Sequence, residues 1–287
     1  MAAVPASAVE ARVPVVEALS ADKVYANGTR ALNPVELAIW PGEFVTLLGP
    51  SGCGKSTLLK MIANLIAPSA GRLLWWRHGF DRVGEAGKQL VMVFQDATLM
   101  PWARVQANVR LPLDLQKINR DSANSRVAEA LALVGLTGFE RHYPRQLSGG
   151  MQMRASIARA LVTDPNLLLM DEPFGALDEF TRNRLDSDLR RLWSARGFTV
   201  VFVTHSIYEA VFLSTRVIVM AARPGRVLAE VKIDEPHPRS DVFRVTQKFA
   251  GYAKQLSEHL ADASSRGATD LCRTAATSRG SRRLASE

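Results

Sequence analysis

The chain passes from FVTLL at residues 44–48 directly into GPSGCGKST at residues 49–57. The first segment is a short apolar run of the kind found in buried parallel strands. The second matches G-x-x-x-x-G-K-[ST], a loop whose glycines let backbone N–H groups surround a polyphosphate. The next residues, STLLKMIANLI, have helical spacing, so the positive end of a helix faces the same anion. This order of strand, loop and helix predicts a nucleotide-binding α/β core.

The loop itself supplies a set of candidate nucleotide contacts. Lys55 would reach the β- and γ-phosphates, and Ser56 would ligate Mg²⁺. The alternative is a glycine-rich turn that binds nothing, but the strand before it and the helix after it are the context that binding requires. The candidate nucleotide-binding residues of this loop are Gly49, Pro50, Ser51, Gly52, Cys53, Gly54, Lys55, Ser56 and Thr57.

A second apolar run, Leu167–Met170, ends in Asp171 and Glu172. Asp171 at the tip of the strand could hold Mg²⁺ through water, and Glu172 is then placed to orient or deprotonate an attacking water. The alternative is an ordinary buried strand that runs out into solvated acids. The phosphate-binding loop upstream favours the catalytic interpretation.

A third motif, LSGGM at residues 147–151, begins a helical pattern. Ser148 is a good helix N-cap, and Gly149 and Gly150 leave backbone N–H groups open to an anion. By itself this segment could be a plain helix cap. Its place upstream of Asp171 makes it a specific match and indicates a further nucleotide contact.

The remaining patterns indicate the fold class. Apolar runs that alternate with helical patterns predict a parallel sheet covered on both faces, and three more such runs are Leu90–Phe94, Val200–Val203 and Val217–Met220. Short alternating stretches in residues 20–48 predict strands separated by turns at Asn27-Gly28, Asn33-Pro34 and Pro41-Gly42. Residues 105–145 are helical and polar, which suggests a separate helical lobe.

We expect one domain over residues 15–235, with the helical lobe inserted at about residues 96–160. Apolar residues at steps of three or four over 242–260 predict an amphipathic helix, so residues 236–262 are expected to form an accessory helical segment. Residues 1–14 show no periodicity, and residues 263–287 are rich in Ser, Thr, Ala and Arg. Both ends are expected to be disordered.

Composition narrows the class of protein. The 287 residues are 47% hydrophobic and 22% charged, which is a globular balance. The longest uninterrupted apolar run, Val217 to Ala222, has six residues, whereas a spanning helix needs about 20. Two cysteines, Cys53 and Cys272, exclude a disulfide framework and a cysteine-rich zinc site. The formal charge is +8, of which +3 lies in residues 263–287, so charge alone does not indicate a nucleic-acid partner.

The chain resembles the nucleotide-binding subunits of ABC transporters over about residues 15–260. The motifs that carry the resemblance stand in the order GPSGCGKST (49–57), Gln95 in VFQD, LSGGMQMR (147–154), LLLMDEP (167–173), GALD (175–178) and His205 in VFVTHS. The resemblance implies an α/β fold: a P-loop NTPase core with a mostly parallel sheet, an N-terminal antiparallel β part and an inserted α-helical lobe. It also implies an ATPase that uses ATP and Mg²⁺.

The resemblance further implies that two copies of the chain pair head to tail around two ATP molecules. Each ATP would touch the P-loop of one copy and Ser148, Gly149 and Gly150 of the other. Asp178 would bridge the two copies. Tyr25, in KVYANGT, matches the aromatic residue that stacks on adenine, although it could instead be a strand-packing aromatic.

The same resemblance assigns the catalytic roles. Gln95 would sense Mg²⁺ and the γ-phosphate and link the two lobes, while His205 would contact the γ-phosphate and anchor the catalytic geometry. Alone, these two would be ordinary polar residues at strand ends. The expected catalytic residues are therefore Glu172, His205, Lys55 and Gln95, and the expected metal-binding residues are Ser56, Gln95 and Asp171.

The chain departs from the family pattern in two places. Met151 and Met153 stand where many relatives have polar Gln or Arg, and thioethers cannot donate hydrogen bonds to ATP. The segment GRLLWWRHGFDRVGEAGKQL, at residues 71–90, departs most. Its Trp75 and Trp76 are expected to pack in the core or at a sheet edge.

The flanking residues narrow the family. VFQDATLMPWARVQANV (93–109), GALDEFTR (175–182) and HSIYEAVFLSTRVIVMAARPGRV (205–227) look like importers of nitrate, sulfonates, taurine or bicarbonate. The implied partners are a transmembrane permease, one helix of which would dock in a groove lined by residues near Gln95 to Arg104, and indirectly an extracytoplasmic solute-binding protein. The expected location is the cytoplasmic face of the inner membrane, as a peripheral subunit.

Two other classes of protein stay open. A soluble ABC-type ATPase that acts on nucleic acid or ribosomes usually carries coiled-coil insertions or two cassettes, but this chain has one P-loop and one LSGG. A non-catalytic regulatory subunit would have lost catalytic residues, whereas Lys55, Asp171, Glu172 and His205 are all present. The motifs favour the import ATPase, with no nucleic acid as a partner.

Overall fold

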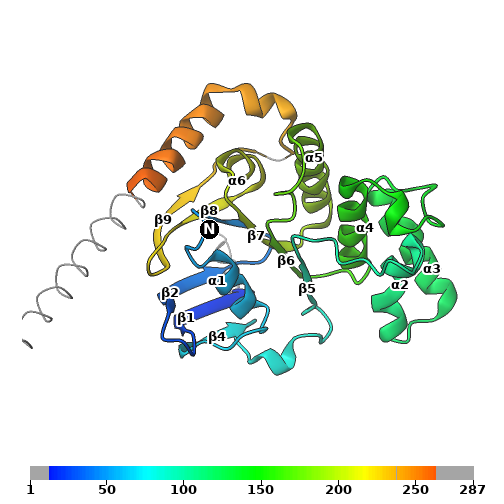
Figure 1. The fold of residues 1–287 in the computed structure, drawn as a ribbon, viewed down its shortest axis with the longest axis horizontal. Coiled ribbons are helices and arrows are strands. Elements are labelled where there is room, and N and C mark those ends of the chain that lie inside the picture. Colours follow the sequence, from blue (N-terminus) through cyan, green and yellow to red (C-terminus); the bar gives the residue numbers. More distant parts are fainter. Residues whose placement is uncertain (1–12, 237, 263–287) are drawn as a thin grey trace, which may run out of the picture.

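The computed structural model describes residues 13–236 and 238–262. Its centre is a six-stranded sheet in the order β5-β6-β7-β3-β8-β9 (Figure 1). The strands are β3 (Phe44–Leu48), β5 (Leu90–Val93), β6 (Leu167–Asp171), β7 (Thr199–Thr204), β8 (Arg216–Ala221) and β9 (Arg226–Lys232). The first five of these in sheet order are parallel, and β9 pairs antiparallel with β8. The expected α/β fold with a mostly parallel sheet is therefore confirmed.

The central strands are buried because both faces of the sheet are covered. All residues of β3 and β7 are buried, and β6 is buried up to Met170. Continuous burial explains why these strands have unbroken apolar sequences rather than alternating ones. The carboxyl ends of β3, β6 and β7 lie side by side, which brings the P-loop, Asp171 and His205 to one edge of the sheet.

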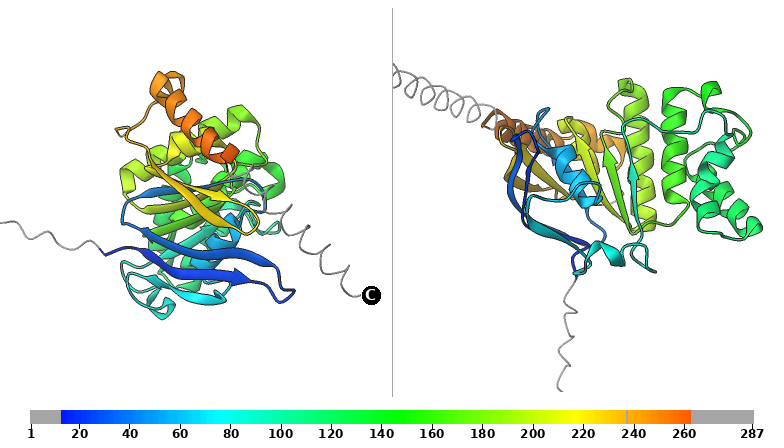
Figure 2. Two further views of the ribbon diagram at one scale, coloured as in Figure 1. Left: turned by 90° about the vertical axis from the view of Figure 1, so that its left-hand side faces the viewer. Right: turned by 60° about the horizontal axis from the view of Figure 1, so that its bottom comes forward.

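A second, antiparallel sheet packs against the first (Figure 2). It consists of β1 (Val16–Val24), β2 (Arg30–Ile39) and β4 (Ala70–Trp75), in the order β2-β1-β4. Helix α1 (Lys55–Ile62) lies between the two sheets, and its Leu58 and Leu59 are buried in a core shared by both. The expected N-terminal antiparallel part is thus present.

One of the three expected turns is wrong. Residues 27–28 and 41–42 lie in turns, but Asn33 and Pro34 lie inside β2. They fall where the register with β1 shifts, between Leu32 and Val35. The bulge at this register shift takes Pro34 out of the ladder with β1, so its missing N–H breaks no strand pairing.

Three helices form a lobe at one side of the molecule (Figure 1). They are α2 (Val105–Leu115), α3 (Arg120–Leu133) and α4 (Gly149–Leu161). Fully buried Asn108 donates to the carbonyls of Met100 and Ala103 and accepts from the Met100 N–H at 2.7 Å, which fixes the loop after β5 onto α2. Arg154 of α4 pairs with Asp188 at 2.6 Å and so ties the lobe to α5 (Glu179–Arg196).

The chain after β9 folds over α6 (Ile207–Leu213). A 3-10 helix, η3 (Asp241–Val245), precedes a helical stretch over residues 247–262, whose Phe249 and Leu256 are buried. Val242 and Val245 differ from the expected stripe, because both are exposed on the 3-10 helix. The expectations for residues 1–12 and 263–287 lie outside the described residues. None of the helices described has the length and apolar character needed to span a bilayer.

The two tryptophans of the divergent segment lie beside the antiparallel sheet. Trp75 ends β4, is buried and donates its indole N–H to the Ile62 carbonyl at 2.9 Å. Its ring meets Phe80 edge to face, with 4.9 Å between centroids. Trp76 is half-buried, with a positive φ of 48°. Trp75 therefore packs in the core, and it also satisfies the carbonyl at the last residue of α1.

Candidate functional site

The P-loop wraps tightly where Gly49 and Gly54 leave no room for a side chain. A Cβ on Gly49 would lie 2.5 Å from the Met220 carbonyl oxygen and 2.6 Å from the Cys53 sulfur. Gly54 has a positive φ of 88°, and its Cβ would lie 2.9 Å from Leu32. Because α1 begins directly after Gly54, its first N–H groups have no partners within the helix and face the loop. The cradle fits an anionic polyphosphate.

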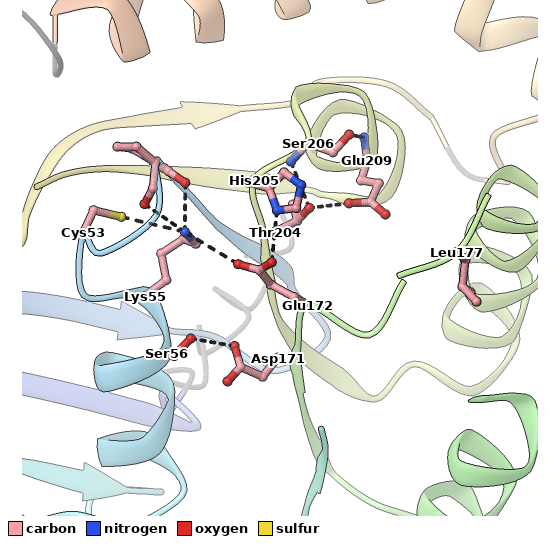
Figure 3. Close-up of polar contacts among 12 residues, drawn as sticks. Cys53, Lys55, Ser56, Asp171, Glu172, Leu177, Thr204, His205, Ser206 and Glu209 are labelled. Carbon is pink, nitrogen blue, oxygen red and sulfur yellow. Dashed lines mark hydrogen bonds and ion pairs between the residues drawn. The ribbon is translucent and has the colours of Figure 1, made fainter. Parts of the chain in front are cut away.

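Lys55 is the buried charge at the centre of this cradle. Its side chain is 4% exposed, and its ammonium donates to the carbonyls of Gly49 at 2.8 Å and Pro50 at 3.1 Å. It also lies 3.8 Å from the Glu172 carboxylate (Figure 3). Beside it, burial raises the pKa of the Cys53 thiol, which favours the protonated and less reactive form. A cation held among carbonyls and one carboxylate is well placed to meet phosphate oxygens.

Ser56 and Asp171 form the pair expected to hold a metal. The Ser56 hydroxyl donates to the Asp171 carboxylate at 2.8 Å (Figure 3). Among the described residues no cluster of three or more His, Cys, Asp or Glu side chains could hold a metal by itself. Magnesium fits this sparse donor set, since it binds through one or two protein oxygens together with phosphates and water.

Glu172 lies between Lys55 and His205. It follows β6 with a positive φ of 45°, a conformation that non-glycine residues rarely adopt, and its N–H donates to the Val203 carbonyl at 3.0 Å. Its carboxylate is 3.0 Å from His205 Nδ1 (Figure 3). Strained backbone of this kind concentrates at functional sites. The turn aims the carboxylate at the P-loop instead of along the strand.

His205 stands between β7 and α6. Ser206 caps α6 by accepting the Glu209 N–H at 3.3 Å, and the Thr204 hydroxyl donates to the Glu209 carboxylate. Sequence reasoning singled out His205 but neither Thr204 nor Glu209. A signal was present, because Glu209 is an acid inside the otherwise apolar segment IYEAVFL.

Tyr25 and Gln95 flank this cluster from other elements. Tyr25 follows β1, is 40% exposed, and its hydroxyl lies 3.4 Å from the Thr57 hydroxyl. Its ring therefore stands beside the P-loop, partly exposed, with the Lys23 ammonium 5.8 Å from its centroid. Gln95 follows β5 and is exposed. Ser51 and Gly52 are exposed at the tip of the loop.

The remaining predicted contacts gather elsewhere, where α4 meets α5. Ser148 caps α4, accepting the Met151 N–H at 3.3 Å, and a Cβ on Gly150 would lie 2.7 Å from Thr181. Asp178 caps α5, and the hydrogen bond from the Thr181 N–H lowers the pKa of its carboxyl. Within the described residues no hydrogen bond joins Ser148, Gly149 or Gly150 to the P-loop. The structure thus divides the predicted site into two separate groups.

The two methionines that depart from the family pattern face inward. Met153 is buried and Met151 is half-buried, and both pack against the core that continues into the lobe. Their thioethers therefore contribute to core packing.

Gly225 was missed by sequence reasoning, although the dipeptide Pro224-Gly225 marks a turn. Its N–H donates to the Ala31 carbonyl at 3.2 Å, and its carbonyl accepts the Asn33 N–H at 2.8 Å. A Cβ there would lie 2.5 Å from the Cys53 carbonyl oxygen. This glycine supports the back of the P-loop.

Sequence comparisons with known proteins identify relatives that bind ATP. The sequence profile described as "ABC transporter" matches residues 32–175. An uncharacterized ABC transporter ATP-binding protein of Methanocaldococcus jannaschii is 46% identical over 82% of this chain and 86% of its own length. The aliphatic sulfonates import ATP-binding protein SsuB of Bacillus cereus is 42% identical over 83% of this chain and 92% of its own.

Solved structures give the same result. CbiO1 of Clostridium perfringens, part of the ABC transporter complex cbiONQ, has a TM-score of 0.70 at 28% identity and covers 80% of this chain and 93% of its own. The ATP-binding cassette MJ0796, a dimer bound to ADP and Pi, has a TM-score of 0.67 at 34% identity and covers 77% of this chain and 100% of its own. This chain belongs to the ABC transporter family, as an ATP-binding subunit with ATPase activity.

Proposed function

We propose that this chain is the ATPase of an importer and energises uptake of a small anion or organic solute, with an aliphatic sulfonate first and nitrate or taurine next. The cluster of Lys55, Glu172 and His205 carries the ATPase part of the proposal, since it joins a phosphate-binding cation, a general base and its anchor. The name of the Bacillus cereus relative, a sulfonate importer's ATP-binding protein, supports the choice of solute.

Each residue has a task in hydrolysis. The P-loop backbone and Lys55 bind the phosphates, and Tyr25 stacks on adenine. Ser56, Asp171 and Gln95 hold Mg²⁺, which when bound neutralises charge on the phosphate oxygens. Glu172 accepts a proton from the attacking water, and His205, at 3.0 Å from that carboxylate, keeps it aimed.

The second group of residues serves another copy of the chain. Ser148 caps α4 and Gly149 and Gly150 begin it, away from the chain's own P-loop, so their N–H groups can complete the site of a partner placed head to tail. Asp178 lies at the same surface. The dimeric cassette MJ0796 supports this arrangement.

A permease helix would dock on the loop that links β5 to the lobe. This loop exposes Trp102 at 77% and Phe94 at 40%, an apolar surface of the kind that receives a partner helix. It follows Gln95, so a change at the γ-phosphate can reach the permease. The chain would then lie on the cytoplasmic face of the membrane, and a solute-binding protein would act through the permease.

The solution mass of Glu172→Gln, with and without ATP and Mg²⁺, tests this function. The amide cannot accept the proton, so we expect lost turnover, retained ATP binding and a dimer that forms only with ATP. Ser148→Arg in the same background blocks the second group and should keep the protein monomeric while it still binds ATP. Full turnover in Glu172→Gln would refute the base, and nucleic acid retained through purification would favour the soluble alternative.

The solute is tested on the complex with its permease. The complex reconstituted in liposomes with its solute-binding protein should hydrolyse ATP faster with an aliphatic sulfonate than without one. Nitrate, taurine and bicarbonate are compared at equal concentration. Stimulation by one of these and none by the sulfonate would reassign the solute and leave the ATPase proposal intact.

A further inference from the structure

A buried acid holds the segment around His205. Glu209 lies one helical turn further along the chain, in α6, and is 4% exposed. Its carboxylate accepts a hydrogen bond from the hydroxyl of Thr204, the residue just before His205. The same hydroxyl accepts the Ser206 N–H at 3.0 Å. Thr204 and Glu209 thus fix the backbone on both sides of His205 (Figure 3).

Arg182 of α5 extends these contacts toward the other group of site residues. Its Nε lies 3.8 Å from the second oxygen of the Glu209 carboxylate, and its Nη2 donates to the Leu177 carbonyl at 2.9 Å. The Leu177 side chain is a neighbour of Gly149, since a Cβ built on that glycine would lie 3.7 Å from it. A line of neighbouring residues therefore runs from Gly149 through Leu177 and Arg182 to Glu209, and through Thr204 to the backbone of His205.

We propose that Glu209 is a positioning residue for ATP hydrolysis, which aims His205 at Glu172 and, through Arg182, connects His205 to the loop at residues 175–178. The inference rests on the proposed function, in which His205 acts at the chain's own ATP and Gly149 at the partner's. The contacts then connect the two nucleotide sites through one chain. A shift of loop 175–178 on pairing would reach His205 by this route.

Capping of α6 does not explain the acid, since Ser206 already accepts the Glu209 N–H. Burial disfavours the carboxylate and raises the pKa of Glu209, so an acid here needs partners. One oxygen accepts the hydrogen bond of the Thr204 hydroxyl, and the other has no hydrogen bond but lies 3.8 Å from Nε of Arg182, within ion-pair distance. A carboxylate offers both an acceptor for Thr204 and a negative charge for Arg182, whereas a neutral side chain of the same shape lacks the charge.

Glu209→Gln separates positioning from bulk stabilisation. An amide has the same shape but no charge and only one acceptor oxygen, so it can keep the Thr204 hydrogen bond only by turning its NH₂ group toward Arg182. We expect kcat for ATP to fall roughly 10- to 100-fold, as for a displaced catalytic group, with KM for ATP unchanged. Thr204→Val should reproduce the fall, and Thr204→Ser, which retains the hydroxyl, should restore activity.

The decisive measurement repeats Glu209→Gln in the His205→Ala background. A residue that acts through His205 has nothing left to position there, so kcat should fall no further. A fall of the same factor in both backgrounds would overturn the proposal. The matched control is Asp22→Asn in the antiparallel sheet, which also replaces a buried acid paired with an arginine, Arg30 at 3.4 Å. An equal loss of kcat in that control would also overturn it, by assigning the effect to the buried acids in general.

These results are distinguishable from failure of the proposed function. Unchanged turnover in His205→Ala alone would refute the catalytic assignment of His205. Lost turnover in His205→Ala together with normal turnover in Glu209→Gln would refute only the positioning role of Glu209.

Discussion

Replacing Gly225 with Ala tests whether the P-loop is held from behind. Gly225 lies outside every nucleotide motif, but because it has no side chain two backbone segments can approach it closely. A Cβ would lie 2.5 Å from the Cys53 carbonyl oxygen and 2.6 Å from that of Ala31, whereas ordinary contact begins at 3.4 Å. Both contacts must therefore open, by about 0.9 Å and about 0.8 Å. Ala31 belongs to a sheet strand and Cys53 to a loop, so we expect residue 225 to move away from Ala31 and to displace the loop.

The magnitude follows from the strain. Overpacking by one methyl group typically costs about 1–3 kcal/mol. If the P-loop relaxes away from the methyl group, ATP must restore the loop when it binds, and the same free energy is lost from binding. At 1.4 kcal/mol per tenfold, Kd for ATP should rise about 5- to 150-fold.

Titration calorimetry of Gly225→Ala with ATP and Mg²⁺ measures this effect, and thermal unfolding reports folding of the same sample. Gly251→Ala is the matched control, since no atom lies within 4 Å of its Cβ and it sits in the helical stretch at 247–262. That variant should bind ATP normally and gain about 0.5–1 kcal/mol of stability. Wild-type ATP affinity in folded Gly225→Ala would refute the reasoning.

Three further predictions concern stability. Burial, reinforced by nearby Glu209, raises the pKa of Asp186 from 3.8 to about 8, so the fold favours the protonated acid. The free energy of unfolding of the wild type should therefore fall as pH rises from 3.8 toward 8. Urea unfolding at several pH values should show a smaller dependence of this free energy on pH for Asp186→Asn, and an equal dependence would contradict the assignment. Trp75→Phe leaves the Ile62 carbonyl without its donor and should cost about 1–3 kcal/mol in denaturant unfolding, with ATP affinity unchanged. Arg239→Ala removes the guanidinium that binds three carbonyls at the end of α6 and should lower stability by about 2–3 kcal/mol; an unchanged unfolding midpoint would count against that role.

Predictions from short sequence patterns were correct where adjacent residues determine the structure, and they were wrong where contacts with other segments determine it. The P-loop could be recognised because glycines, Lys55 and the flanking apolar runs lie within one short segment. Asn33-Pro34 has the composition of a turn, but the pair lies inside β2. Pairing with β1 on either side of the pair keeps it in the strand, and a shift of register accommodates it. The apolar pattern that includes Val242 and Val245 spans two elements, the 3-10 helix and the helix that follows it. These two side chains therefore do not lie on the buried face of that second helix.

The sequence by itself determined the fold class, the family and the chemistry of most site residues, because strand, loop and helix signals are carried by adjacent residues. Only the tertiary structure decided which of those residues meet. Parallel strands bring Lys55, Glu172 and His205 to one edge of the sheet, and the packing of α4 on α5 places Ser148 to Gly150 apart from them. It also placed Glu209, Arg182 and Gly225, whose roles depend on contacts between distant segments. Such contacts follow from burial and close approach in the folded chain, which short-range patterns do not encode.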